Sequence, residues 1–205
     1  MKRAGLTFTF RETMEGGFAL CEQDCFAGEK KGRAEGCSLA MHAQIEIEDI
    51  FGFCDDPNHR GTISGQIDFT PFGENLPAHT GVFNLFCPAD DPRMKLMIYE
   101  MGFRHNGKDY YLAGKKEVKD DPGFDIWSDT TTLYTVLHDG PDKSAPVIGA
   151  GVLRLSVGEL LKLIRTMTVP NATSLREKAD CVSTFGTFFL GKLWQNYAKM
   201  AQTDS

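Results

Sequence analysis

Apolar and polar residues alternate along most of the chain before Leu155, which is the pattern of strands with one buried face. The clearest stretch runs from Leu39 to Ile47, where apolar residues at the odd positions alternate with His42, Gln44 and Glu46. Residues 94–104 are apolar on both faces, as in a strand covered on both sides. The pattern predicts about eight strands with short connections: 6–14, 39–47, 63–69, 81–85, 94–104, 110–118, 131–138 and 147–155.

Such a meander leaves unpaired edge strands, and closure into a barrel removes them. We therefore predict a mainly β protein with an antiparallel barrel of about eight strands, of the lipocalin or calycin type, and keep an open two-sheet sandwich as the alternative. Asn106–Gly107 is typical of a type I′ hairpin turn. Several strand glycines suit sharp coiling or a close backbone approach. A barrel of this size is either filled by side chains or holds one small ligand.

The period changes after Leu155, where two capping boxes open helical segments. Ser156 with Glu159 begins the first helix, and Ser174 with Glu177 begins a second that runs to about Lys199. The second helix has an apolar stripe of Val182, Phe185, Phe189, Leu193 and Tyr197, widened by Phe188 and Trp194. We predict a barrel over residues 1–156 and a helical appendage over 157–205 packed on it, as one domain overall. Docking of the second helix onto another domain or subunit is the alternative.

The composition disfavours some classes of binding partner but does not identify one. The net charge of −6 and the pI of about 5.4 disfavour nucleic acids and anionic membranes, which attract basic surfaces. The sequence has no apolar run long enough for a membrane span and no export signal, so we expect a cytoplasmic protein with six free thiols. The polar segments 22–36 and 49–61 are expected to be loops, either of which could form a lid on the barrel.

The candidate chemistry is concentrated between Gly114 and Thr135. The five histidines are scattered, and nucleotide-binding and nucleophile motifs are missing, so we expect no metal and no cofactor. Asp121-Pro122-Gly123 predicts a turn, across which the flanking strands would pair and bring lysine and aspartate side chains near Trp127. Structural, binding and catalytic roles all remain open for this segment. The candidate ligand-binding residues are Lys116, Asp121, Trp127, Asp129, Thr131 and Tyr134.

Three stretches carry a resemblance to a known family: Leu6–Gly16, Gly81–Phe86 and Gly114–Tyr134 with its Asp-Pro-Gly-Phe-Asp-Ile-Trp motif. They resemble an accessory domain of large bacterial proteins that lies beside a GMC-type, cholesterol-oxidase-like flavin oxidoreductase, often with an α/β-hydrolase module. The segment Phe185–Tyr197 resembles the helix that follows this domain. The resemblance implies a role near sterol or lipid oxidation, with a GMC-type oxidoreductase as partner. It assigns no catalytic residue, and the flavin-binding fingerprint is missing, so the chain is not the oxidase itself.

Three hypotheses follow. The first is a non-catalytic barrel that holds an apolar or sterol-like molecule or serves the oxidase. The second is an interaction module that docks through the Phe185–Tyr197 helix. The third is a small barrel enzyme that uses Lys116 with a neighbouring aspartate and Trp127 on a lipid-like substrate. We expect no catalysis, and the third hypothesis is kept as an alternative.

Overall fold

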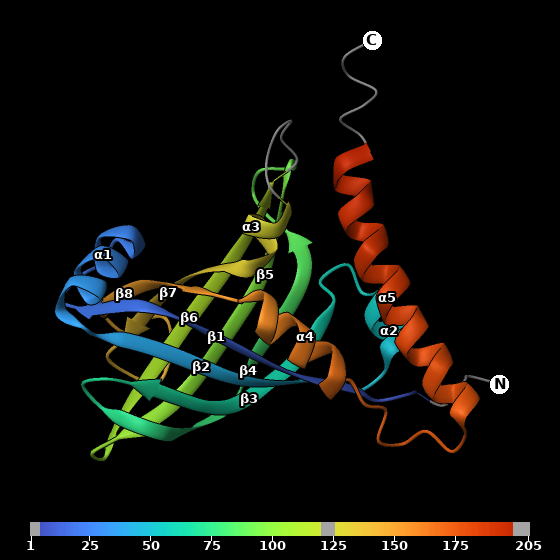
Figure 1. The fold of residues 1–205 in the computed structure, drawn as a ribbon, viewed down its shortest axis with the longest axis horizontal. Coiled ribbons are helices and arrows are strands. Elements are labelled where there is room, and N and C mark those ends of the chain that lie inside the picture. Colours follow the sequence, from blue (N-terminus) through green and yellow to red (C-terminus); the bar gives the residue numbers. More distant parts are fainter. Residues whose placement is uncertain (1–4, 120–125, 199–205) are drawn as a thin grey trace, which may run out of the picture.

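The computed structural model describes residues 5–119 and 126–198, which form a closed antiparallel barrel with helices against it (Figure 1). Each strand pairs with its neighbour in sequence, and β1 closes the barrel by pairing with β8. This arrangement confirms the predicted eight-stranded barrel and excludes the open sandwich. The strands are β1 (Phe8–Leu20), β2 (Ser38–Ile47), β3 (Arg60–Phe69), β4 (Gly73–Pro88), β5 (Met94–His105), β6 (Lys108–Lys119), β7 (Thr132–His138) and β8 (Val147–Arg154).

The barrel interior is filled at one end by aromatic rings. Phe18 meets Phe69 edge-on with ring centroids 5.3 Å apart, and Phe72 lies 4.9 Å from both Phe69 and Tyr110. Phe103 stacks on Tyr110 at 5.6 Å. Aromatic pairs of this geometry bury much apolar area and add about 0.5–1.5 kcal/mol each beyond that burial. This end of the barrel is therefore closed, and any internal space lies toward the other end.

The backbone confirms two predictions, a type I′ hairpin turn and a close approach of two strands at a glycine. Asn106 and Gly107 both have positive φ angles, 49° and 78°, as a type I′ turn between β5 and β6 requires. At Gly81 a Cβ atom would lie 1.8 Å from the carbonyl oxygen of Glu100, so β4 approaches β5 too closely for any side chain at this position.

Both C-terminal helices begin where the capping boxes predict. The Ser156 hydroxyl accepts the Glu159 N–H (3.2 Å) at the start of α4 (Val157–Thr166), and the Ser174 hydroxyl accepts the Glu177 N–H (3.2 Å) at the start of α5 (Leu175–Ala198). The helix α5 stands across the end of the barrel opposite to α1 (Figure 1).

The aromatic face of α5 is turned toward the barrel. Phe185 packs on Phe8 at 4.6 Å, and Phe189 packs on Phe86 at 5.4 Å. Phe188 lies 4.6 Å from the His59 ring. These contacts support the prediction that the helix packs on the barrel. Phe185, Phe188 and Phe189, three of the aromatic residues that the docking hypothesis assigned to a partner, pack within the chain.

Three shorter helices were not predicted, so the residues that the structure describes contain five helices rather than two. They are α1 (Cys25–Glu35), α2 (Ile50–Asp55) and α3 (Ile126–Thr131). The first two lie in segments that the sequence presented as loops. The third ends at Thr131, the first residue of the strand predicted over 131–138, so that strand begins one residue later than predicted. The predicted turn at residues 121–123 lies outside the described residues.

The helix α1 escapes prediction because it packs through glycines. A Cβ atom at Gly28 would lie 2.1 Å from the carbonyl oxygen of Ala150, and one at Gly32 would lie 2.3 Å from the backbone nitrogen of Phe18. The Asp24 side chain caps the helix N-terminus, and Gly36, with φ 67°, ends it. The helix therefore has no apolar stripe, although its backbone lies directly on β1 and β8.

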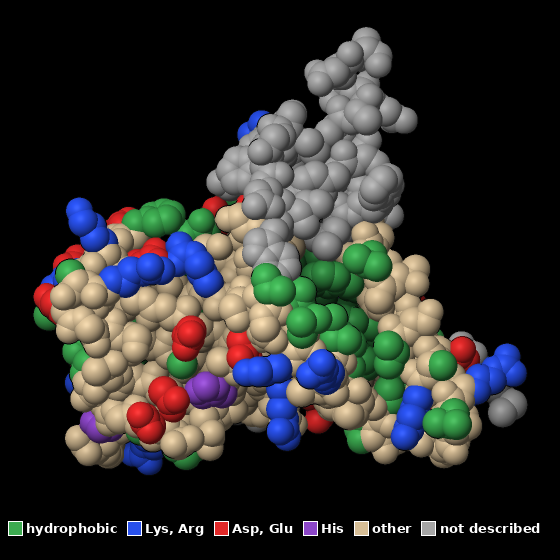
Figure 2. All heavy atoms as spheres, in the orientation of Figure 1, with side chains coloured by type: hydrophobic (Ala, Val, Ile, Leu, Met, Phe, Trp, Pro, Cys, Tyr) green, Lys and Arg blue, Asp and Glu red, His purple; other side chains and the backbone are tan. Residues whose placement is uncertain are grey.

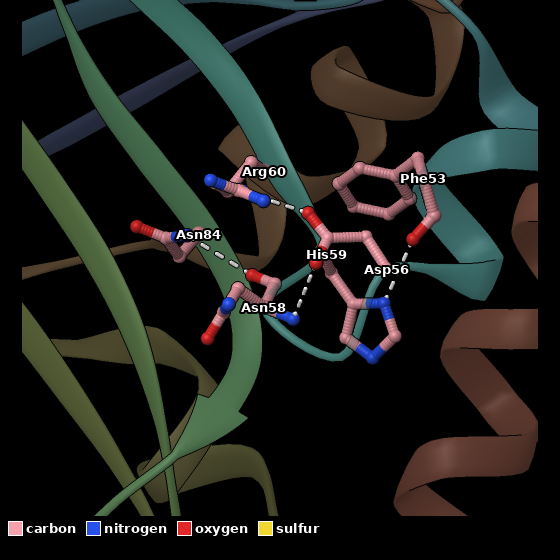
Figure 3. Close-up of polar contacts among 6 residues, drawn as sticks. All are labelled: Phe53, Asp56, Asn58, His59, Arg60 and Asn84. Carbon is pink, nitrogen blue, oxygen red and sulfur yellow. Dashed lines mark hydrogen bonds and ion pairs between the residues drawn. The ribbon is translucent and has the colours of Figure 1, made fainter.

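The helix α2 and the turn that follows it form a compact corner before β3 (Figure 3). Asp56 accepts hydrogen bonds from the Asn58 N–H (3.0 Å) and from Arg60 Nε (2.8 Å). His59, buried and with φ 43°, donates from Nδ1 to the Phe53 carbonyl at 2.8 Å. This corner carries the surface on which Phe188 of α5 rests.

None of the described helices has the length and apolarity needed to cross a bilayer.

Candidate functional site

An apolar cavity of about 340 Å³ lies inside the barrel at the end covered by α4 and α5. Phe10, Phe83, Leu85 and Met97 line it from the strands, and Leu160, Leu163, Phe185 and Phe189 line it from the helices. Its volume falls at the lower end of the roughly 300–1,000 Å³ typical of small-molecule sites. The barrel is therefore filled at one end and hollow at the other.

The cavity reaches the surface between α4 and α5, where apolar side chains gather (Figure 2). Ile164 and Leu190 line the cavity and are nevertheless 53% and 66% exposed. Leu161, the next exposed apolar residue on α4, does not line it. The helical side of the cavity is thus a thin apolar wall rather than a deep core.

A buried polar triangle lies in this otherwise apolar lining. Lys116 of β6 donates to Glu12 Oε1 of β1 at 2.9 Å and to the Tyr99 hydroxyl of β5 at 3.3 Å, and that hydroxyl donates to Glu12 Oε2 at 3.2 Å. The Lys116 and Glu12 side chains are each 3% exposed. All three residues occupy inward-facing positions of their strands and line the cavity. We call Glu12, Tyr99 and Lys116 the polar triangle.

The electrostatics of the polar triangle keep its tyrosine neutral. Burial raises the pKa of Tyr99 well above its usual value, and the neighbouring Glu12 charge raises it further. The Lys116 ammonium also lies 4.6 Å from the centre of the Tyr99 ring, within cation–π range. The phenol therefore remains a hydrogen-bond donor to Glu12, and the opposite charges of Lys116 and Glu12 compensate each other.

The structure does not bring the predicted site residues together at one site. Lys116 and Thr131 line the cavity. Asp129 is buried in α3 but is not among the lining residues. Tyr134 points to the outside of the barrel, where its ring meets Phe26 of α1 at 5.5 Å. Asp121 and the side chain of Trp127 lie outside the described part of the structure.

The carboxylate that meets Lys116 in the cavity is Glu12, whereas the sequence suggested an aspartate across the turn. The strands on either side of that turn, β6 and β7, do pair as predicted. Glu12 and Tyr99 were missed as candidates. A signal existed, since Glu12 interrupts an inward-facing row of Phe8, Phe10 and Met14, but nothing in the sequence places this row opposite Lys116.

A second polar cluster lies on the outer wall of the barrel. The Thr13 hydroxyl lies 3.1 Å from His42 Nδ1, and His42 Nε2 lies 3.0 Å from Asp68 Oδ2. Asp68 also accepts the Asn75 N–H at 2.6 Å, which is the main cause of its lowered pKa. The hydroxyl–imidazole–carboxylate order resembles a nucleophilic triad. Its residues face outward from neighbouring strands, however, and they connect β1, β2 and β3 with the start of β4.

The described residues contain no group of three or more His, Cys, Asp or Glu side chains that could hold a metal ion. Comparison with protein-family models, with curated proteins and with solved structures finds no match to this chain. The resemblance to accessory domains of GMC-type oxidoreductases therefore stays a prediction from the sequence.

Proposed function

We propose that this chain is a lipocalin-like binding protein that holds one apolar small molecule in the barrel, with the polar end of that molecule at the polar triangle. The observation that carries the proposal is the cavity of about 340 Å³, lined mainly by aromatic and aliphatic side chains. Small-molecule sites commonly combine such a lining with a few polar groups that orient the ligand. The closed aromatic end of the barrel supports this reading, because it makes the cavity a pocket rather than a channel.

The polar triangle itself supports a role in binding. A buried ion pair adds little stability, and replacing one with apolar residues of similar volume is often neutral or stabilising by about 1–4 kcal/mol. Three polar side chains inside an apolar barrel are therefore poorly explained by folding. They are better explained as groups that receive the polar end of a ligand.

From the sequence resemblance alone, we also propose that the ligand is sterol-like or another lipid and that a GMC-type oxidoreductase is the partner. The cavity is compatible with an apolar ligand, and the binding proposal does not depend on the partner. A tagged chain expressed in its own cells should then co-purify with such an oxidoreductase. An eluate without any flavin oxidoreductase contradicts this part of the proposal.

Ligand binding is tested with N-phenylnaphthylamine, a neutral apolar dye that becomes fluorescent in apolar sites. We expect saturable binding of one dye per chain. Leu160→Trp should weaken this binding at least about tenfold, because the indole would fill the cavity from α4. Leu161→Trp is the matched control, since it makes the same change one residue later on α4, at a position that is 54% exposed and outside the lining.

The two variants distinguish cavity binding from adsorption to the apolar surface. Surface adsorption would be unaffected by Leu160→Trp or would change equally in both variants. Either result, or the lack of saturable binding to the unmodified chain, overturns the binding proposal.

A further inference from the structure

We propose that the cavity accepts ligands whose polar end is neutral, a hydroxyl or a carbonyl group, and discriminates against carboxylates. This inference rests on the proposed function and deepens it by naming the ligand class. It follows from the charge and from the hydrogen-bonding capacity of the polar triangle.

The charge of the polar triangle is already balanced. Lys116 and Glu12 are each 3% exposed and lie in direct contact at 2.9 Å. The Tyr99 hydroxyl donates to Glu12 as a neutral phenol. A carboxylate ligand would bring a second negative charge beside Glu12 with one ammonium to serve both. A buried charge without its own counter-charge is strongly unfavourable, so the ionised acid is disfavoured.

The hydrogen-bonding capacity of the polar triangle matches a hydroxyl group. An ammonium group has three donor hydrogens, and among the described residues Glu12 and Tyr99 use two of those on Lys116. The Glu12 oxygens each accept one bond here and retain further lone pairs. A ligand hydroxyl can accept from Lys116 and donate to Glu12, and a carbonyl can accept from Lys116. A carboxylate can accept from Lys116 but meets the Glu12 oxygens as another acceptor.

The inference is tested by displacement of N-phenylnaphthylamine from the full chain with dodecanol, methyl dodecanoate and dodecanoic acid near neutral pH. The ester is the matched control for the acid, because it has the same chain and carbonyl group without the charge. We expect dodecanol and the ester to bind at least about tenfold more tightly than the acid, a difference of about 1.4 kcal/mol.

Two variants test whether the compensated charge is the cause. Glu12→Gln leaves Lys116 without its counter-charge, so the acid should become the tighter ligand. The double variant Glu12→Gln, Lys116→Met removes both charges and should restore the preference for dodecanol. Circular dichroism establishes that each variant is folded. If Glu12→Gln does not fold, the ranking of dodecanol, the ester and the acid by the unmodified chain still decides the inference.

The outcomes separate this inference from the function on which it rests. If the dye does not bind, the proposed function is overturned and the inference falls with it. If the dye binds and the acid displaces it as well as dodecanol does, the inference alone is overturned. The same holds if the dye binds and no member of the series displaces it, or if Glu12→Gln leaves the ranking unchanged.

Discussion

The effect of burial on an ionisable side chain depends on which groups are buried beside it, as Lys116 and His59 show. Lys116 enters the barrel together with Glu12, so the pair remains compensated. His59 is 3% exposed, and its ring lies against the ring of Phe53 (Figure 3). It also lies against the ring of Phe188 of α5. Burial is the main cause that lowers its pKa, and the Lys192 and Lys95 charges lower it further. The Phe53 carbonyl and Asp56 act in the opposite direction but do not offset the burial.

This lowered pKa makes a prediction about pH and stability. The unfolded chain takes up a proton at His59 near the ordinary pKa of about 6.5, whereas the folded chain does so at a lower pH. Folding is therefore increasingly disfavoured as the pH falls below about 6.5, until the folded pKa is reached. Denaturant titrations at about pH 7.5 and about pH 5.5 should show a smaller pH-dependent loss of unfolding free energy in His59→Asn than in the unmodified chain.

Asparagine is chosen for this test because it tolerates the positive φ of 43° at this position. The packing that it removes changes stability at both pH values, so the comparison isolates the titration. An equal loss in both proteins contradicts the prediction. No sequence pattern indicated this buried histidine, because its contacts come from α2 and α5, which are far apart in the chain.

At the scale of elements, apolar periodicity predicted the strands and α5. It did not predict α1, because this helix packs through glycines. Strands of the barrel bury one face, so alternation identifies them directly. The helix α1 buries backbone instead, and its buried residues are Gly28 and Gly32. A prediction that depends on the spacing of apolar side chains assigns a polar, glycine-containing segment to a loop.

Substitution of glycines in two helices tests this explanation. Gly32→Ala should destabilise the chain by about 1–3 kcal/mol, because its Cβ would lie 2.3 Å from the Phe18 nitrogen and α1 must move outward. Gly186→Ala in α5 is the control, since a Cβ there has no neighbour within 4 Å and should stabilise the helix by about 0.5–1 kcal/mol. Chemical denaturation measures both. Equal effects of the two substitutions would show that α1 does not rest on its glycines.

At the scale of the whole molecule, a rigid barrel is combined with a helical wall of α4 and α5. The strands are joined in a closed ladder without edges, whereas the wall contacts the barrel through side chains and leaves Leu161, Ile164 and Leu190 exposed. Regions with fewer buried contacts open at lower free energy than the core. The wall is therefore the route by which we expect a ligand to enter.

Hydrogen exchange measured by mass spectrometry tests this division. Amides of α4 and of the described part of α5 should exchange faster than those of the strands at the closed end, such as β5 and β6. Saturation with N-phenylnaphthylamine should slow exchange mainly in the wall, because the ligand would join it to the strands beneath. Uniform exchange across the chain, or protection confined to the strands, contradicts this description of the entry route.

The sequence by itself determined the strands in outline, the type I′ turn and the starts of both C-terminal helices, whereas the pairing of β1 with β8 in the structure decided between a closed barrel and an open sandwich. The features that the sequence determined depend on local patterns: alternation, turn residues with positive φ and capping hydroxyls.

Only the tertiary structure decided that Lys116 meets Glu12 and Tyr99, that Tyr134 faces outward and that one end of the barrel is hollow. Glu12 and Lys116 are 104 residues apart, and their contact depends on the curvature of the closed barrel. No local pattern encodes which inward positions on distant strands face each other across an interior. The cavity likewise depends on how far the aromatic rings and the C-terminal helices fill the barrel, which is a property of the packed molecule.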